Sequence, residues 1–117
     1  MGGWYAAHGL YRPEELGGLS AQRFCEAVRA EGVSTSPGAN FLLHLHPLLN
    51  EADVNGQPTR LANADRDDHH RQVSLPVSEA MPDRVYSIPW FKKFRPRLIE
   101  EHAAAFRKVA EQADSLI

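Results

Sequence analysis

The C-terminal segment carries an apolar stripe at helical spacing, and this stripe limits the fold more than any other feature of the sequence. Pro96 marks its start, because proline suits the first turn of a helix, where its missing N–H has no intrahelical partner to lose. Charged side chains fall mainly on the other face, so the segment predicts a long amphipathic helix. The stripe consists of Leu98, His102, Phe106, Val109, Ala113 and Leu116, and is widened by Ile99, Ala103 and Ala110.

A second helix is predicted over residues 20–31. The Ser20 hydroxyl can accept a hydrogen bond from a free amide of the first turn. Leu19 and Phe24 have the spacing of a hydrophobic staple across that start. Gly32 stands where a glycine commonly ends a helix.

Shorter elements complete the pattern. The aromatic-rich residues 4–11 and residues 85–88 are predicted to be strands, and residues 33–35 a brief third one. Residues 77–81 follow a proline that suits a short helix. There are no internal repeats. The sequence therefore predicts a single α+β domain over residues 1–117, with a small antiparallel sheet and helices packed on one side.

A less regular region lies between these elements. Residues 41–49 form an apolar run with His44 and His46, predicted to be extended at first and helical after Pro47. Residues 50–72 are polar and dense in charge, and are predicted to form a mobile surface loop.

The composition excludes several classes of protein. A net charge of −2 argues against broad nucleic-acid or membrane binding. Cys25 is the only cysteine, so no internal disulfide can form and a reducing compartment is favoured. No apolar stretch approaches the roughly 20 residues of a membrane helix, and no signal peptide is recognisable. We therefore expect a cytoplasmic protein.

Five short blocks lie along the chain in a characteristic order and spacing. They are Trp4-Tyr5-Ala6-Ala7-His8-Gly9-Leu10-Tyr11, Leu43-His44-Leu45-His46-Pro47-Leu48, Leu75-Pro76-Val77-Ser78-Glu79, Ile88-Pro89-Trp90-Phe91 and Ala105-Phe106-Arg107-Lys108-Val109-Ala110. Together they resemble the small C-terminal domain of DegT/DnrJ/StrS-type sugar aminotransferases, which are pyridoxal-phosphate enzymes that put an amino group on nucleotide-linked or free sugars. The resemblance covers nearly the whole chain and implies the small-domain fold of fold-type I aminotransferases.

The resemblance also implies what the chain lacks. The family's Schiff-base lysine belongs to a large domain upstream, and Lys92, Lys93 and Lys108 do not stand in a matching context. No glycine-rich phosphate cup is present either. We therefore expect no catalytic residues, no cofactor bound by this chain alone, and no transamination without partners. The implied partners are a large pyridoxal-phosphate-binding domain or a second subunit, and a sugar or nucleotide-sugar, with a homo-oligomer as a further expectation.

Candidate substrate contacts follow from the same resemblance. The family segment that matches residues 43–48 lies at the mouth of the active site, which makes His44 the first candidate for a polar contact to the sugar. Asn40 and Phe41 stand just ahead of it, and His46 follows. Gly38-Ala39-Asn40 replaces an aromatic or histidine pair common in the family, so the identity of the sugar stays open. The ordinary alternative is a hydrogen-bonded histidine that ends a strand.

A metal site is the third reading of these histidines. In a strand, His44 and His46 would point to one face, as two ligands of one zinc ion must. His69 and His70 are adjacent, so they would face opposite ways in extended chain, and the acidic residues near them are typical of a solvated loop. No metal-binding spacing supports a site, and none is predicted.

The other histidines, the cysteine and two of the aromatic residues are expected to have structural roles. We expect His8 to be a paired core or interface histidine, His102 to be packed, and Cys25 to be a buried inert thiol. Tyr86 and Trp90 are expected to fill the core.

If the large domain is absent, aromatic residues that would pack against it are left exposed. Such a surface favours self-association or binding of a partner. The candidates are Trp4, Tyr5, Tyr11, Trp90 and Phe91. The alternative function is therefore a standalone, non-catalytic binding or interaction module derived from such a domain.

Overall fold

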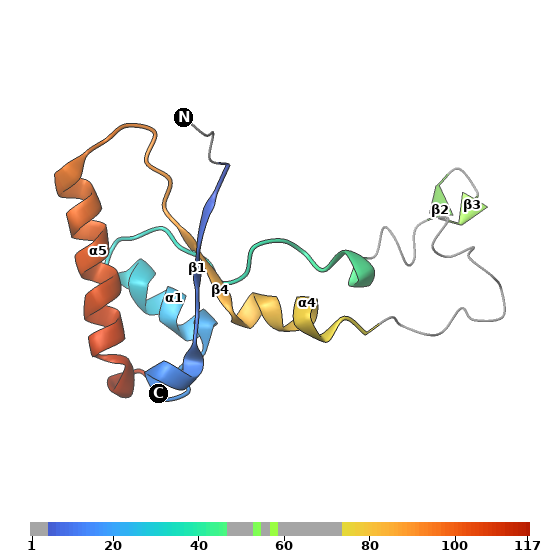
Figure 1. Cartoon of the computed structure of the whole chain (residues 1–117), viewed down its shortest axis with the longest axis horizontal. Coiled ribbons are helices and arrows are strands. Elements are labelled where there is room, and N and C mark those ends of the chain that lie inside the picture. Colours follow the sequence, from blue (N-terminus) through green and yellow to red (C-terminus); the bar gives the residue numbers. More distant parts are fainter. Residues whose placement is uncertain (1–4, 47–52, 55–56, 59–73) are drawn as a thin grey trace. The chain divides into compact units, whose positions relative to one another are not determined.

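The computed structural model describes residues 5–46, 53–54, 57–58 and 74–117 (Figure 1). The chain divides into two compact units. Met1–Ala39 together with Ala80–Ile117 is called the core unit below, and Asn40–Glu79 is called the insert unit.

The core unit is α+β, as the sequence predicts. Its helices are α1 (Ala21–Ala30) and α5 (Pro96–Glu111), and its strands are β1 (Ala7–Leu10) and β4 (Val85–Ile88). The two strands run antiparallel, with Gly9 opposite Tyr86 and Ala7 opposite Ile88 (Figure 1). The described residues of this unit also form the 3-10 turns η1 (Pro13–Leu16), η3 (Met81–Asp83) and η4 (Ala113–Ser115).

The outer edge of β4 is occupied by residues 36–38. Ser87 N–H donates to the Ser36 carbonyl at 2.9 Å, and Gly38 N–H donates to the Val85 carbonyl at 2.8 Å. The pairing is an isolated bridge between Pro37 and Tyr86, and the strand predicted at residues 33–35 does not form. Both hydrogen bonds flank Pro37, so a backbone N–H at this position would point away from β4 and the proline costs the pairing no hydrogen bond.

The local signals of α1 are confirmed. Ser20 is its N-cap, and the Ser20 hydroxyl accepts from Arg23 N–H at 3.2 Å. At the other end Gly32 has φ +90°, with its N–H bonded to the Arg29 carbonyl at 2.9 Å. Val33 N–H reaches the Val28 carbonyl at 3.3 Å. These two bonds form a Schellman motif, which needs a left-handed residue where Gly32 stands.

Replacing Ser20 with alanine is expected to lower the free energy of unfolding by about 1 kcal/mol, because one first-turn amide loses its acceptor. Urea unfolding followed by circular dichroism measures the loss. Exposed Ser34 supplies a matched serine-to-alanine control, expected to stay within about 0.5 kcal/mol of the parent. Equal stabilities of the two variants would contradict a stabilising cap.

Four aromatic rings meet in the core: Tyr11 directly after β1, Tyr86 within β4, Phe24 in α1 and Phe106 in α5. The Phe24 ring lies 5.1 Å from that of Tyr11, 5.7 Å from that of Tyr86 and 6.2 Å from that of Phe106, between centroids. The face of β4 that carries Tyr86 is therefore the face covered by α1 and α5, which confirms helices on one side of the sheet. Tyr11 also donates its hydroxyl to the Leu19 carbonyl at 2.7 Å.

Cys25 is fully buried, as predicted. Its sulfur lies 3.8 Å from the Thr35 hydroxyl oxygen. Burial raises the pKa of the Cys25 thiol above its ordinary value, so the thiol stays protonated near neutral pH and is a poor nucleophile.

Helix α5 starts at Pro96 as predicted, but part of its predicted stripe is wrong. Ala105, Val109 and Ala113 are buried, whereas Ala103 is exposed. The buried face runs at intervals of four residues, which turns α5 slightly from the predicted face. His102 is half-buried, with Nδ1 2.8 Å from the Leu98 carbonyl and its ring 5.1 Å from that of Phe91.

Trp90 and His8 do not lie in the core, whereas Tyr86 does. His8 is exposed, because the alternation of β1 turns it away from the face that carries Gly9, and its alternative role as an interface histidine stays a prediction. Trp90, which lies two residues after the end of β4, is 64% exposed and does not fill the core. Tyr86 packs into the ring cluster as expected.

The insert unit contains short elements. These are η2 (Leu43–Leu45), β2 (Asp53–Val54) paired antiparallel with β3 (Gln57–Pro58), and α4 (Pro76–Ala80), whose last residue falls in the core unit. A short helix was predicted at residues 77–81, and α4 confirms it within one residue. The two-residue strands fall inside the predicted loop over residues 50–72. The rest of that loop, and the predicted helical part after Pro47, lie outside the described residues.

Candidate functional site

The first candidate site joins two segments of the insert unit. His44 Nε2 lies 3.0 Å from Glu79 Oε1, although the residues are 35 positions apart in the sequence. The same carboxylate oxygen accepts a hydrogen bond from Leu75 N–H at 2.7 Å. Side-chain exposure is 13% for His44 and 36% for Glu79, so the pair is partly shielded and still reachable from solvent.

The position of Glu79 has a local cause. Leu75 immediately precedes α4, so its N–H is one of the amides left without an intrahelical acceptor. Glu79 is one turn into the helix and folds back onto that amide. The Leu75 N–H, and after it the His44 imidazole, hold the pKa of Glu79 below its ordinary value. The carboxylate is thus charged near neutral pH and orients the imidazole ring.

This arrangement predicts an acid titration. Because its folded pKa is depressed, Glu79 contributes stability that is present above the unfolded pKa and lost as pH falls through the folded pKa. The Glu79 side-chain carbon shift in NMR should therefore have its midpoint below that of an unstructured glutamate. His44→Ala should recover only a minor part of the difference, since the Leu75 N–H is the larger cause. A full return to the ordinary value in His44→Ala would contradict this order of causes.

The other predicted substrate contacts lie on the same short segment. Phe41 is 63% exposed and Asn40 is exposed, while His46 is half-buried. The Phe41 and His46 rings meet edge to face, 4.9 Å between centroids. The structure thus pairs Phe41 with His46 and His44 with Glu79. The sequence analysis assigned no role to Glu79. Its position one turn after the helix-starting Pro76 could have indicated that its carboxylate caps the start of the helix.

Residues 43–45 form a 3-10 turn and not the extended chain expected at the start of this apolar run. The argument that His44 and His46 would share one face, which required a strand, therefore does not hold. Among the described residues, no group of three or more histidine, cysteine or acidic side chains could hold a metal ion. His69 and His70 lie outside those residues.

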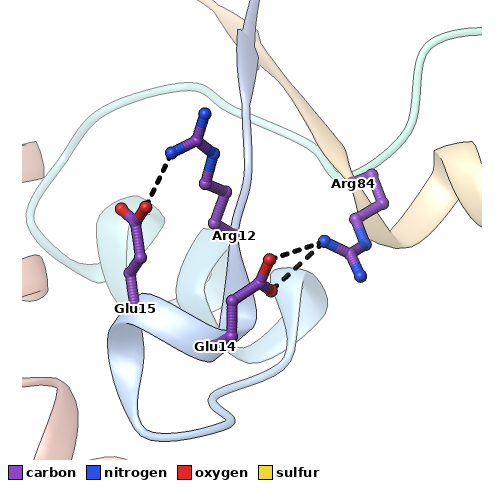
Figure 2. A network of polar contacts seen from close by, with 4 residues as sticks. All are labelled: Arg12, Glu14, Glu15 and Arg84. Carbon is purple, nitrogen blue, oxygen red and sulfur yellow. Dashed lines mark hydrogen bonds and ion pairs between the residues drawn. The ribbon is translucent and has the colours of Figure 1, made fainter.

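The core unit has a groove of about 450 Å³ beside β1 and η1. Its rim carries Arg12 and Glu15, joined by an ion pair of 2.7 Å (Figure 2). Arg84 also donates to both carboxylate oxygens of the neighbouring Glu14, at 2.9 and 3.2 Å (Figure 2). These pairs neutralise the rim, so the groove offers no net charge to a ligand. It is lined by Leu10, Tyr11, Arg12, Glu15, Leu16, Phe24, Tyr86 and Ala110.

The lysines of the chain do not line this groove. Lys108 Nζ is held by Glu31, at 2.7 and 2.8 Å from the two carboxylate oxygens. Lys92 and Lys93 are exposed between β4 and α5. A lysine that reacts with a carbonyl group must be deprotonated and oriented, and neither position supplies a desolvated pocket.

In comparisons with known proteins, no protein-family model, curated protein or solved structure matches this chain. Within the part of the chain that the structure describes, no helix has the length and apolar character needed to cross a membrane.

Proposed function

We propose that this chain is the C-terminal small domain, as a fragment or a truncated form, of a pyridoxal-phosphate-dependent sugar aminotransferase. In that enzyme it helps to close the active site and to orient the sugar. The contact between His44 and Glu79 is the observation that supports this most, because it brings together two of the five blocks that resemble the family. Inference from such a resemblance is associational, so the residues must be tested directly.

The geometry of residues 40–46 suits a sugar. An imidazole oriented by a carboxylate presents a fixed donor or acceptor to a hydroxyl group. The exposed ring of Phe41 offers an apolar surface to the C–H face of a sugar ring. Asn40 and His46 would add polar contacts beside them. Holding the substrate in reacting geometry is a catalytic contribution, although it acts only when the reacting groups are supplied.

Those groups would come from partners. Pyridoxal phosphate serves as an electron sink when bound, and in this proposal the large domain or a second subunit holds it. The chain's own contribution is to bind and position the sugar. The working compartment is the cytoplasm, and a homo-oligomer is the expected assembly.

The genomic DNA upstream of the Met1 codon tests this proposal first. An open frame that encodes a lysine-bearing large domain would support it. In that full-length enzyme, His44→Ala should raise KM for the sugar about tenfold or more, as expected when a hydrogen bond to a substrate hydroxyl is lost. The cofactor absorbance should not change. Exposed His8 in the core unit supplies the matched histidine-to-alanine control. An unchanged KM in His44→Ala would remove His44 from the substrate site.

A second candidate function is a standalone interaction module, favoured by exposed aromatic side chains. Tyr5 is 94% exposed, Trp90 64% and Phe94 84%. Large exposed apolar groups often mark a binding surface. A stop codon close upstream of Met1, with a ribosome-binding site, would favour this candidate. The isolated module should be monodisperse and melt cooperatively, whereas a fragment should be marginally stable until a large-domain partner is added.

A further inference from the structure

The two edges of the small sheet in the core unit differ. Residues 36–38 cover the outer edge of β4, where their backbone bonds to Val85 and Ser87. Among the described residues, no element covers the outer edge of β1. An uncovered edge strand presents a row of backbone N–H and C=O groups with which another strand can pair.

The pairing of β1 with β4 identifies which backbone groups lie on this open edge. Tyr11 N–H donates to the Arg84 carbonyl at 2.7 Å. Because the backbone direction alternates along a strand, Tyr11 and Gly9 face β4, and His8 and Leu10 direct their N–H and C=O groups away from it. Within the described part of the chain, these outward groups have no hydrogen-bond partner.

The sequence around β1 does not protect this edge. Natural edge strands commonly carry a charged side chain, a proline or a bulge that prevents pairing with another chain. Residues 5–11 contain no lysine, arginine, acidic residue or proline. The ladder from Ala7 to Leu10 has no bulge. Just ahead of the strand, Tyr5 is 94% exposed, and a large exposed ring of this kind often marks a contact surface.

The groove of the core unit lies beside the open edge. Its walls are mainly apolar and come from the end of β1, η1, α1 and α5, and the ion pair of Arg12 with Glu15 lies on its rim. In the view of Figure 2, Arg12 and Glu15 lie to one side of β1, and Arg84, which precedes β4, lies to the other. A strand added to the open edge would therefore run past this groove.

We infer that β1 pairs antiparallel with β1 of a second copy of this chain, and that Tyr5 of each copy fills the groove of the other. Outward-facing residues of the two strands bond to one another, with Leu10 opposite Ala6 of the second copy. In this register Tyr5 of the second copy stands opposite Tyr11, and directly opposite side chains share a face of the sheet. Tyr11 is buried on the face that the helices cover, and it lines the groove.

Tyrosine suits this position chemically. Its ring matches the apolar walls, and its hydroxyl group can bond to the polar rim formed by Arg12 and Glu15. The two side chains of the rim neutralise each other, so burial of an uncharged phenol there leaves no charge unpaired.

A second copy is the occupant because one chain carries both halves of the contact. Each copy supplies an open edge, a groove and an exposed tyrosine, so a two-fold axis makes every contact twice. The pairing consumes both open edges, and the assembly therefore closes at two chains. A strand from another protein would cover the edge and leave Tyr5 exposed. The contact uses residues of the core unit alone, and it does not depend on the proposed function.

Sedimentation equilibrium of the whole chain, from micromolar to millimolar concentration, tests the inference. The mass should rise from 13.1 kDa towards twice that value and stop there. Tyr5→Ala should raise the dissociation constant about tenfold or more, because an anchoring ring is lost twice in each dimer, whereas Tyr5→Phe should keep most of the affinity. Phe94→Ala removes another exposed ring and should stay within about twofold of the parent.

A pair of double variants tests the register. Ala6→Lys with Leu10→Lys places like charges opposite each other in the dimer and should abolish it. Ala6→Glu with Leu10→Lys places opposite charges there and should retain it. Both side chains are exposed in the single chain, and the two variants differ only at residue 6. Circular dichroism checks that each variant is folded.

Several results would overturn the inference. A chain that stays monomeric at millimolar concentration would leave the edge to a strand of a different protein. Equal association of the two charge variants, equal association of Tyr5→Ala and the parent, or growth beyond two chains would contradict this interface. A stop codon upstream of Met1 would defeat the proposed function and leave a measured dimer standing, whereas a monomer would leave the proposed function untouched.

Discussion

Replacing Phe24 with alanine is expected to lower the free energy of unfolding by about 3–5 kcal/mol, the range measured when a large core aromatic is truncated. Phe24 is 4% exposed and its ring contacts those of Tyr11, Tyr86 and Phe106. Truncation removes the transfer free energy of the ring and leaves a cavity among three aromatic neighbours. Because a domain of this size is stable by only about 5–15 kcal/mol, the loss should be visible as a large fall in melting temperature.

Urea unfolding monitored by circular dichroism measures this loss. Phe94 gives a matched phenylalanine-to-alanine control, because its ring is 84% exposed and its removal should change stability by less than about 0.5 kcal/mol. A loss below about 1 kcal/mol in Phe24→Ala, similar to that of the control, would mean that the four rings do not form the core described above.

Replacing Gly9 with alanine is expected to destabilise the core unit by about 1–3 kcal/mol, the usual cost of overpacking. Gly9 lies directly opposite Tyr86 in the ladder, and a Cβ atom on Gly9 would overlap the Tyr86 ring. The ring cannot easily turn aside, because its centroid lies 5.7 Å from that of Phe24 and 5.5 Å from that of Phe106.

A double-mutant cycle with Tyr86→Ala tests the cause. Once the Tyr86 ring is removed, Gly9→Ala should be neutral or slightly stabilising, since alanine has less conformational entropy to lose in a strand than glycine. The sign of the effect should thus reverse between the two backgrounds. An equal loss in both backgrounds would show that Gly9 is needed for its backbone and not for the space above it.

The candidate site was only partly accessible from the sequence. The segment with Asn40, Phe41, His44 and His46 was selected by its resemblance to a family. The contact between His44 and Glu79 was not predicted. Glu79 is 35 positions away from His44, and the two side chains meet only when η2 and α4 come together. Residues 43–45 form a turn where the sequence predicted extended chain, because the periodicity of a short apolar run does not distinguish these two conformations.

The sequence by itself determined the elements whose signals are local. Ser20 and Gly32 mark the two ends of α1, because they form hydrogen bonds with nearby amides and carbonyls. Pro96 starts α5 through its own ring geometry. Only the tertiary structure decided which faces are buried: Ala105 in place of Ala103, Tyr86 above Gly9, and Trp90 in solvent. The physical reason is that capping acts within one turn of chain, whereas burial depends on the rotation and register of elements that are distant in sequence.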